Sequence, residues 1–327
     1  MIVTRSPLRI SVGGGGTDLP SYYEKREGFL VAMAIQAHVY VSVQRTLEPG
    51  ILLKYSRIER PGRVAEIEHP IIREALLEHG LGEETALEVT SVADIPAGTG
   101  LGSSGSFTTA LMQALAVLRG AAMRTEEVAA SACRIELDRL REPIGKQDQY
   151  IAAYGGLCGF HFRADGRVEV ERMELPPETH TRLQSHTLMF FTGRTRSAGE
   201  ILKQQDTASR AMDAGMLANL DRVKAMGFEI RDALLAGRLD RWGEIMREHW
   251  EAKKQRSSGM SNPQIDAWYD LAMASGAIGG KLVGAGGGGF LLFHAHDPEA
   301  LRAAMTGAGL KEVPLRLQPQ GTTIIAP

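Results

Sequence analysis

Alternating apolar and polar side chains predict three strands in the first half of the chain. The first covers residues 2–12 and runs into four consecutive glycines. The second lies within residues 30–46, where every other position from 39 to 43 is valine, as a half-buried strand requires. The third extends over residues 86–95 and ends at Pro96, which cannot continue a central ladder.

After this third strand the apolar residues change to helical spacing. In residues 104–119 they recur every three or four positions, and Gly120 follows as a residue suited to end a helix. A further helix is expected from Thr125 to about Arg141, before Pro143 breaks the pattern.

The second half of the chain has longer helical segments and shorter strands. It opens with a short apolar strand at 187–192, followed by helices at about 198–235 with one break, 239–256 and 263–275. Two glycine-punctuated strands near 278–294, a helix after Asp297 and a closing strand pair complete it. The order strand, strand, helix, strand is typical of a split α+β sandwich of the ferredoxin-like type. We place a domain boundary near residue 185, which gives domains 1–185 and 186–327.

Composition narrows the class of protein. Of 327 residues, 43% are hydrophobic and 23% charged, as in an ordinary soluble globular protein. The net charge of −2 and the scattered Lys and Arg residues argue against a nucleic-acid or anionic membrane partner. No run of about 18 apolar residues could span a membrane, and the first residues lack the apolar stretch of a secretory signal. We therefore expect a cytoplasmic enzyme, with Cys133 and Cys158 as two small buried thiols.

The strongest chemical signal is the glycine-serine loop at residues 96–106. Its spaced glycines let the backbone approach a ligand, and its serines fall where a helix begins, a position that favours an anion. A dinucleotide fingerprint is excluded because the helix after the loop leads into another helix, not a strand. An ordinary glycine turn with a serine cap is the weaker alternative. The expected phosphate contacts are Pro96, Gly98, Gly100, Leu101, Gly102, Ser103, Ser104, Gly105 and Ser106.

Two other glycine clusters leave alternatives open. Asp18 follows the run from Gly13 to Gly16 and could accept hydrogen bonds from substrate hydroxyls or cap the helix that starts at Leu19. The cluster at 279–289 reads about equally well as a turn packed on another loop or as a ligand contact.

Two acidic residues between the predicted helices are candidates for chemistry. Asp148 could act as a base on an alcohol in phosphoryl transfer, or it could simply cap a helix. Glu136, taken alone, reads more readily as a solvated helix charge. Local sequence does not separate these alternatives.

Taken together, these segments resemble the GHMP kinase superfamily, which includes galactokinase and the homoserine, mevalonate and phosphomevalonate kinases. The three family motifs occur in order, at Pro7–Asp18, Pro96–Ser106 and Lys281–Gly289, and the resemblance runs essentially from end to end. It implies a two-domain α+β fold, with a ribosomal-protein-S5-like N-terminal domain and a ferredoxin-like C-terminal domain.

The resemblance also implies roles for individual residues. The loop at 96–106 would wrap the phosphates of ATP, and Ser104 and Glu136 would bind Mg²⁺. Asp148 corresponds to the catalytic aspartate. Arg9 stands where the family has a Lys or Arg near the reacting hydroxyl, and there it would stabilise charge on the transferred phosphoryl group.

The first motif departs from the family's usual Gly-Glu-His and reads Gly-Gly-Gly-Gly-Thr-Asp. This variant, with residues 145–149 and 191–198, is similar to the sugar-1-kinase branch and specifically to D-glycero-D-manno-heptose 7-phosphate kinases. The branch implies a sugar phosphate substrate and a second anion site, for which Arg194, Arg196 and Lys253 are candidates. Each of these three, taken alone, reads as an exposed surface cation. The implied substrate contacts are Gly15, Gly16, Thr17, Asp18, Arg194, Arg196, Gly286 and Gly287.

Alternatives to this function remain at the level of sequence. The acceptor could be another sugar such as fucose, or the chain could be a nucleotide-binding homologue that lost catalysis. The presence of Asp148, Glu136 and Arg9 together argues against the loss of catalysis. A homodimer is left open as the quaternary state.

Overall fold

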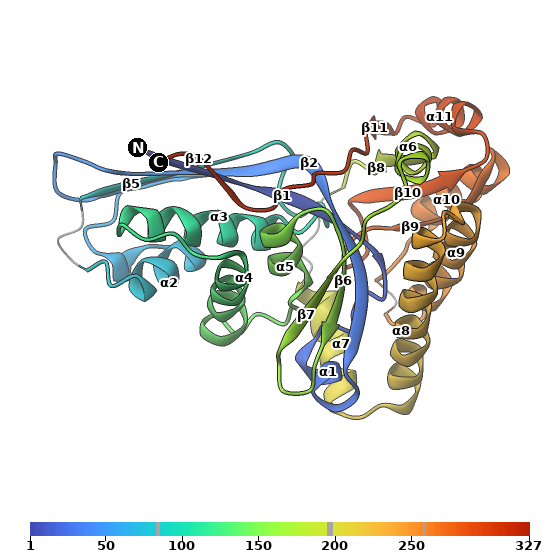
Figure 1. The fold of residues 1–327 in the computed structure, drawn as a ribbon, viewed down its shortest axis with the longest axis horizontal. Helices are drawn as coiled ribbons and strands as arrows, with labels where there is room; N and C mark the ends of the chain where they lie inside the picture. The colour runs from blue at the N-terminus through green and yellow to red at the C-terminus, as the bar shows by residue number, and fades with distance from the viewer. Residues whose placement is uncertain (83–85, 195–198, 258) are drawn as a thin grey trace.

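The computed structural model describes residues 1–82, 86–194, 199–257 and 259–327. Two β-sheets, each covered by helices, lie side by side in the fold (Figure 1). Within these ranges, no helix has both the length and the apolar character needed to cross a bilayer.

The first sheet contains eight strands, in the order β12-β1-β2-β5-β3-β4, with β6 and β7 branching from β2. The long strand β2 connects the two parts because its first residues pair with β6 and its last residues pair with β5. The bounds are β1 Ile2–Gly13, β2 Gly28–Arg45, β3 Ile51–Lys54, β4 Ile58–Glu59, β5 Leu87–Ala93, β6 Leu157–Phe162, β7 Val168–Arg172 and β12 Thr323–Ala326.

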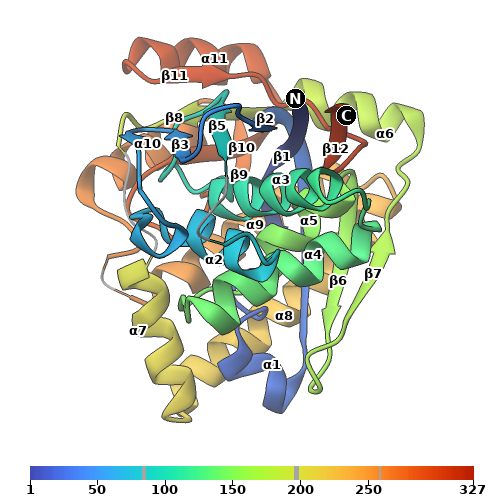
Figure 2. The ribbon, with the colours of Figure 1, turned by 90° about the vertical axis from the view of Figure 1, so that its left-hand side faces the viewer.

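Helices cover one face of this sheet (Figures 1 and 2). The central one, α3, spans Ser103–Leu118 and is buried along most of its length, because apolar residues occur on every side of it. Its neighbours are α2 Pro70–Glu78, α4 Thr125–Cys133 and α5 Gln147–Tyr154, while α1 Pro20–Arg26 and the short 3₁₀ turn Val64–Glu66 lie in loops.

The helix expected from Thr125 to about Arg141 changes its geometry midway. After Cys133 it continues as a π-helical segment, Arg134–Arg139. Such wide turns occur mostly as short insertions in α-helices and often at functional sites. This one carries Glu136, which is buried in the protein interior.

The second sheet has four antiparallel strands in the order β11-β8-β10-β9. Numbered along the chain this is 4-1-3-2, the ferredoxin-like order that the sequence predicted. Its strands are β8 Thr187–Phe191, β9 Ala277–Leu282, β10 Phe290–Ala295 and β11 Lys311–Val313. Its helices are α6 Pro177–His186, α7 Gly199–Arg210, α8 Ala214–Leu235, α9 Leu239–Lys254, α10 Pro263–Ala274 and α11 Pro298–Gly307.

The two last strands do not form the expected closing pair. β11 adds to β8 in the second sheet, whereas β12 pairs with β1 in the first. The intervening segment returns along β2, where Gln36 and Ala34 bond to the backbone of Arg316 and Gln318. This return covers an edge of β1 that would otherwise be exposed. The segment 186–327 therefore includes one strand of the first sheet, and the two chain ends lie together (Figure 1).

Packing and charge join the two halves. One hydrophobic cluster contains Ile10 of β1 together with Ile230 of α8 and Val283 after β9. Phe29 of β2 stacks on Phe228 of α8 with ring centroids 3.9 Å apart.

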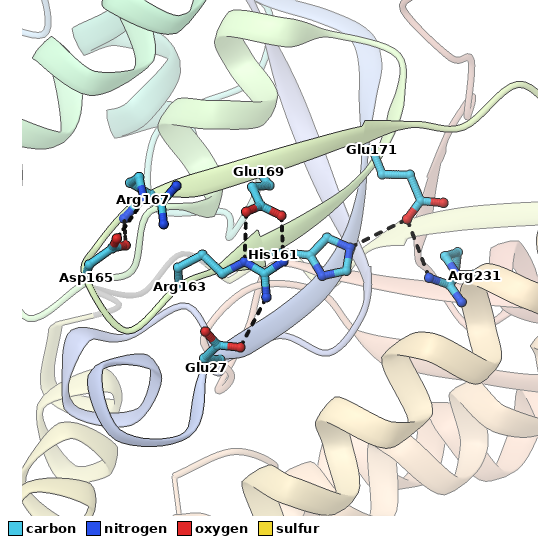
Figure 3. Close-up of polar contacts among 8 residues, drawn as sticks. All are labelled: Glu27, His161, Arg163, Asp165, Arg167, Glu169, Glu171 and Arg231. Atoms are coloured by element: carbon cyan, nitrogen blue, oxygen red, sulfur yellow. Dashed lines mark hydrogen bonds and ion pairs between the residues drawn. The ribbon is translucent and has the colours of Figure 1, made fainter.

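A polar network reinforces this junction at the surface (Figure 3). Glu171 of β7 lies between His161 of β6 and Arg231 of α8, while Arg163 pairs with Glu169 and Glu27. These contacts hold α8 against the β6–β7 hairpin.

Candidate active site

A cavity of about 660 Å³ lies between the two halves of the protein. The glycine-serine loop, the first glycine cluster and the start of α5 line it from the first half. The end of α9 and the β9–β10 loop line it from the second half. All three glycine clusters found in the sequence therefore meet at one site.

The central feature of the cavity is an ion pair between Arg9 and Asp148. Arg9 Nε and Nη2 each donate to one Asp148 carboxylate oxygen at 2.7 Å, the bidentate geometry that makes such pairs strong. The Arg9 side chain is only 6% exposed, but that of Asp148 is 26% exposed and reachable from the cavity. Arg9 Nη1 also donates to the Gly100 carbonyl at 2.6 Å, which ties the pair to the glycine-serine loop.

The glycine-serine loop passes too close to this pair for side chains to be tolerated. Gly102 precedes α3 in the left-handed region at φ 74°, and a Cβ there would lie 3.0 Å from Arg9 Cγ. At Gly105 a Cβ would lie 2.8 Å from Asp148 Cβ. The N-terminus of α3, with its free N–H groups, is thereby brought directly against the carboxylate.

Glu136 and Ser104 form a second polar pair in the cavity. The Ser104 hydroxyl donates to Glu136, and Gln149 Nε2 donates to the other carboxylate oxygen at 3.0 Å. Glu136 is 1% exposed, so the prediction of a solvated helix charge is wrong. Burial raises the pKa of this carboxyl to about 7, with a smaller contribution from the charge of Asp148. The partners of Glu136 are neutral, and a divalent cation fits this setting.

Asp18 does not cap the helix that follows it. The N-cap of α1 is Leu19, whereas the Asp18 carboxylate accepts from the N–H of Gly16 at 3.1 Å and of Gln147 at 3.2 Å. It thus connects the first glycine cluster to the start of α5. Gly145 packs so tightly on it that a Cβ would overlap the carboxylate. Burial, and secondarily the charge of Asp148, raise the pKa of Asp18.

The third glycine cluster packs backbone to backbone against the first loop. A Cβ on Gly284 would meet Gly100, and one on Gly289 would meet the Thr99 carbonyl. Gly286 lines the cavity, whereas Gly287 donates its N–H to the Met260 carbonyl at 3.0 Å and is not part of the lining. The third glycine cluster therefore both packs on the glycine-serine loop and lines part of the cavity.

Several residues expected at the site serve as its framework. The Thr17 hydroxyl bonds to the carbonyls of Gly14 and Phe29, and the Ser106 hydroxyl to those of Pro7 and Gly102. The side chain of Leu101 is buried in the core. The residues expected at the site that do not line the cavity are Thr17, Pro96, Leu101, Ser106, Arg194 and Gly287. Arg194 is exposed, and Arg196 lies outside the described residues.

A group of buried basic side chains at the cavity was largely missed from the sequence. His249, Lys253, Arg256 and Lys281 all line the cavity and are at most 8% exposed. Of these only Lys253 had been singled out, and as a single residue it was interpreted as an exposed cation. Positions 249, 253 and 256 are spaced i, i+4, i+7, so helical periodicity could have placed them on one face of α9 and its end.

The far end of the cavity is apolar and partly aromatic. Val39, Ile71 and Phe107 line it together with Tyr55 and His69, whose rings meet edge to face at 4.8 Å. Such a surface suits a flat aromatic group, so the cavity runs from an apolar end past the glycine-serine loop to a basic end.

Comparison with known proteins agrees with this geometry. The family model for the GHMP kinase N-terminal domain matches residues 69–156, and the model for the GHMP kinase C-terminal domain matches residues 230–311. The chain is 26% identical over 302 residues to a D-glycero-alpha-D-manno-heptose 7-phosphate kinase of Campylobacter jejuni, covering 89% of this chain and 88% of that protein. It is 29% identical to an L-fucokinase/L-fucose-1-P guanylyltransferase of Bacteroides fragilis, covering 90% of this chain but 35% of that protein.

Solved structures show the same fold. A D-glycero-D-manno-heptose 1-phosphate kinase from Bacteroides thetaiotaomicron superposes with a TM-score of 0.81 at 22% identity, covering 100% of this chain and 99% of that one. The two family models match one region in each half of the fold, and the chain belongs to the GHMP kinase family.

Proposed function

We propose that this protein transfers the γ-phosphoryl group of ATP to the anomeric hydroxyl of a sugar. The acceptor we propose is D-glycero-D-manno-heptose 7-phosphate, which would become the 1,7-bisphosphate. The observation that carries the proposal is the bidentate Arg9–Asp148 pair, held against the N-terminus of α3 inside the cavity. A carboxylate, a cation and a phosphate-binding loop in contact are the parts that phosphoryl transfer requires.

The shape of the cavity supports one orientation of ATP. The adenine would lie at the apolar end beside Tyr55 and Phe107, and the triphosphate along the loop from Gly98 to Gly105. The free N–H groups at the start of α3 would then face the phosphates, as helix N-termini do in anion sites. This orientation brings the γ-phosphate to Asp148.

Ser104 and Glu136 would bind Mg²⁺. Within the described residues no cluster of three or more metal-binding side chains is present, but Mg²⁺ is usually held by one or two carboxylates together with substrate phosphates. When bound, the ion would neutralise charge on the β- and γ-phosphates. Gln149, which donates to Glu136, would hold that carboxylate in position.

Asp148 would orient the acceptor hydroxyl and take up its proton. Arg9 bonds to both carboxylate oxygens and so restricts the group, while the Asp148 side chain stays partly exposed at the cavity. The new bond joins the sugar oxygen to phosphorus as the bond from phosphorus to the leaving ADP oxygen breaks. Arg9 would stabilise the negative charge that spreads over the transferred group.

The choice of acceptor rests on the relatives and on the first motif. The Campylobacter jejuni relative is a heptose 7-phosphate kinase and matches along nearly its whole length. The Bacteroides fragilis relative combines fucokinase with a second activity and matches over about a third of its length. L-Fucose is accordingly the second candidate, and a nucleotide-binding protein without kinase activity is the third.

One experiment separates these candidates. ADP release by the purified protein is measured with Mg²⁺ and ATP against heptose 7-phosphate, L-fucose and D-galactose, each with Asp148→Asn as the blank. Acceptor-dependent release with heptose 7-phosphate as the preferred acceptor is expected. Preference for L-fucose would make L-fucose the acceptor. If no sugar caused ADP release, the kinase assignment would be wrong.

A further inference from the structure

The basic end of the cavity is unusual because three buried cations converge there without carboxylate partners. Lys253, Arg256 and Lys281 are 7%, 8% and 2% exposed. Within the described residues none of them forms an ion pair. Their hydrogen bonds go to backbone carbonyls and to the Asn219 amide oxygen. Burying charge in this way is costly unless a counterion is supplied.

The charges around this group are mainly positive. Lys281 and Lys253 interact unfavourably with each other, with Arg256 and with Arg9, and only Arg256 has a nearby carboxylate, that of Asp18. Burial, and secondarily the charges of Arg256 and Arg9, lower the pKa of Lys281 to about 7. Burial also lowers the pKa of Arg256 to about 10, against the opposing effect of Asp18. A dianion entering the group would remove this repulsion.

Free hydrogen-bonding groups also point to a ligand. Arg256 Nη2, both ring nitrogens of His249 and the Ser11 hydroxyl are buried at the cavity, and none has a partner among the described residues. Buried polar groups are seldom left unsatisfied in native proteins. Side chains from α9, the turn after it and β1 therefore bring unsatisfied polar groups to this end of the cavity, where a phosphate group could bind.

The position of the group relative to the reacting centre fits one end of an acceptor molecule. Lys281 donates to the Val12 carbonyl at 3.2 Å and Arg256 to the Gly15 carbonyl at 2.8 Å, both beyond Arg9 along β1 and its loop. Val12 lies three positions beyond Arg9 along the strand, which is about 10 Å at roughly 3.3 Å per residue. A sugar whose reacting hydroxyl lies at Asp148 can reach across this distance with a phosphate on its far end. The γ-phosphate of ATP, held at Asp148, is too far away to bind the same cations.

We infer that Lys253, Arg256, Lys281 and His249 form a second anion site that binds a phosphate monoester already present on the acceptor. The inference rests on the proposed function and refines it, because it names the residues that would bind the phosphate already present on the acceptor. It also moves the anion site from the exposed Arg194 to the buried end of the cavity.

The test compares two acceptors that differ only in the remote phosphate, D-glycero-D-manno-heptose 7-phosphate and D-glycero-D-manno-heptose. The main variant is Lys281→Met. Lys253→Met and Lys254→Met form a matched pair on α9, since Lys254 is partly exposed and bonded to Glu251. The wild-type protein should prefer the phosphorylated acceptor by about 100-fold or more in kcat/KM.

Lys281→Met should lower kcat/KM for the phosphorylated acceptor by about 10- to 100-fold, chiefly through KM, since a charge-assisted hydrogen bond is lost. The kcat/KM for the unphosphorylated acceptor should fall much less, and the KM for ATP should stay near its wild-type value. Lys253→Met should act similarly, Lys254→Met should match wild type, and Lys281→Arg should restore part of the preference. Equal losses on both acceptors, or a raised KM for ATP, would assign the group to the reacting centre and overturn the inference.

A binding measurement separates failure of this inference from failure of the proposed function. Thermal shift without ATP is recorded with heptose 7-phosphate, unphosphorylated heptose and inorganic phosphate, for wild type and for each variant. Stabilisation by heptose 7-phosphate that Lys281→Met abolishes supports the site even if no ADP is released. Turnover without preference for the phosphorylated acceptor would overturn the second anion site and leave the kinase assignment intact.

Discussion

Gly102 stands directly against the carboxylate of Asp148. A Cβ on Gly102 would lie 3.2 Å from Asp148 Cγ and 3.1 Å from Arg9 Nε. Gly102, which precedes the central helix α3, therefore also sets the space left for the ion pair. The glycine-serine loop and the Asp148 carboxylate can approach this closely because position 102 has no side chain.

Gly102→Ala should inactivate the protein while leaving it folded. The added methyl group presses on Arg9 and Asp148, so a fall in kcat of about 100-fold is expected from misplacement of the reacting groups. The matched control is Gly120→Ala at the other end of the same helix, where φ is also positive, at 76°, but no atom lies within 4 Å. Both variants should lose about 1 kcal/mol of stability from backbone strain. A Gly102→Ala protein with wild-type kcat would show that the pair tolerates displacement.

Asp148→Asn should reduce kcat by about 10²- to 10⁴-fold, the range typical of a lost general base. The ATP dissociation constant should stay within a few-fold of wild type because the glycine-serine loop, the proposed phosphate site, is untouched. Steady-state kinetics and fluorescent-nucleotide binding give the two values. Asp165→Asn, on the exposed β6–β7 turn, serves as the control. Turnover retained in Asp148→Asn would remove this residue from the chemistry.

Glu136→Gln should increase the Mg²⁺ concentration needed for half-maximal activity by about 10- to 100-fold, because a carboxylate ligand becomes a neutral amide. Without Mg²⁺ the variant should be more stable than wild type, since a buried carboxyl group is replaced. Titrating Mg²⁺ at saturating ATP, with melting curves in EDTA alongside, measures both effects. An unchanged Mg²⁺ requirement would place the ion elsewhere.

Lys281→Met should raise the thermal stability of the ligand-free protein at neutral pH. The folded-state pKa of Lys281, about 7, lies below its ordinary value of 10.5, so the unfolded chain binds more protons between these values. The charged lysine therefore destabilises the fold fully below pH 7, and the effect fades as the pH rises towards 10.5. The groups that face it are Arg9, His249, Lys253 and Arg256.

The gain in the free energy of unfolding should be on the order of 1 kcal/mol or more at pH 7 in a buffer free of phosphate and sulfate. It should shrink by pH 9.5, and 10 mM phosphate should narrow it at pH 7 by stabilising the wild type. Differential scanning calorimetry across this pH range measures the difference. A variant less stable than wild type at every pH would mean that the bond to Val12 outweighs the repulsion.

Sequence patterns predicted the elements of this fold better than their long-range pairing. The strand β1 and the helix α3 follow from periodicity, and the ferredoxin-like sheet follows from element order. The pairing of β12 with β1 could not be predicted, because residues 323–326 carry no signal that distinguishes one partner strand from another. Pairing is decided by which edge the tertiary fold leaves open.

The candidate site was likewise predictable from the sequence only in part. Arg9 and Asp148 are 139 positions apart, so nothing local joins them, and their meeting was expected only from the family resemblance. Residue type alone predicts an exposed Glu136, whereas the structure buries it on a π-helical segment. In the basic group, helical spacing links positions 249, 253 and 256, but Lys281 comes from a strand remote from α9 and no sequence pattern joins it to them.

The return of the last strand means that two covalent connections, and not one, run between the two sheets. A fragment that stops near residue 185 would keep the glycine-serine loop and Asp148 but lose the strand that pairs with residues Val3 to Arg5. Its β1 edge would be open to self-association, because the final residues of the chain are the ones that cover that edge. Conversely, the ends lie close enough for a short linker to join them, and a circularly permuted protein opened at an exposed loop should fold with its cavity intact.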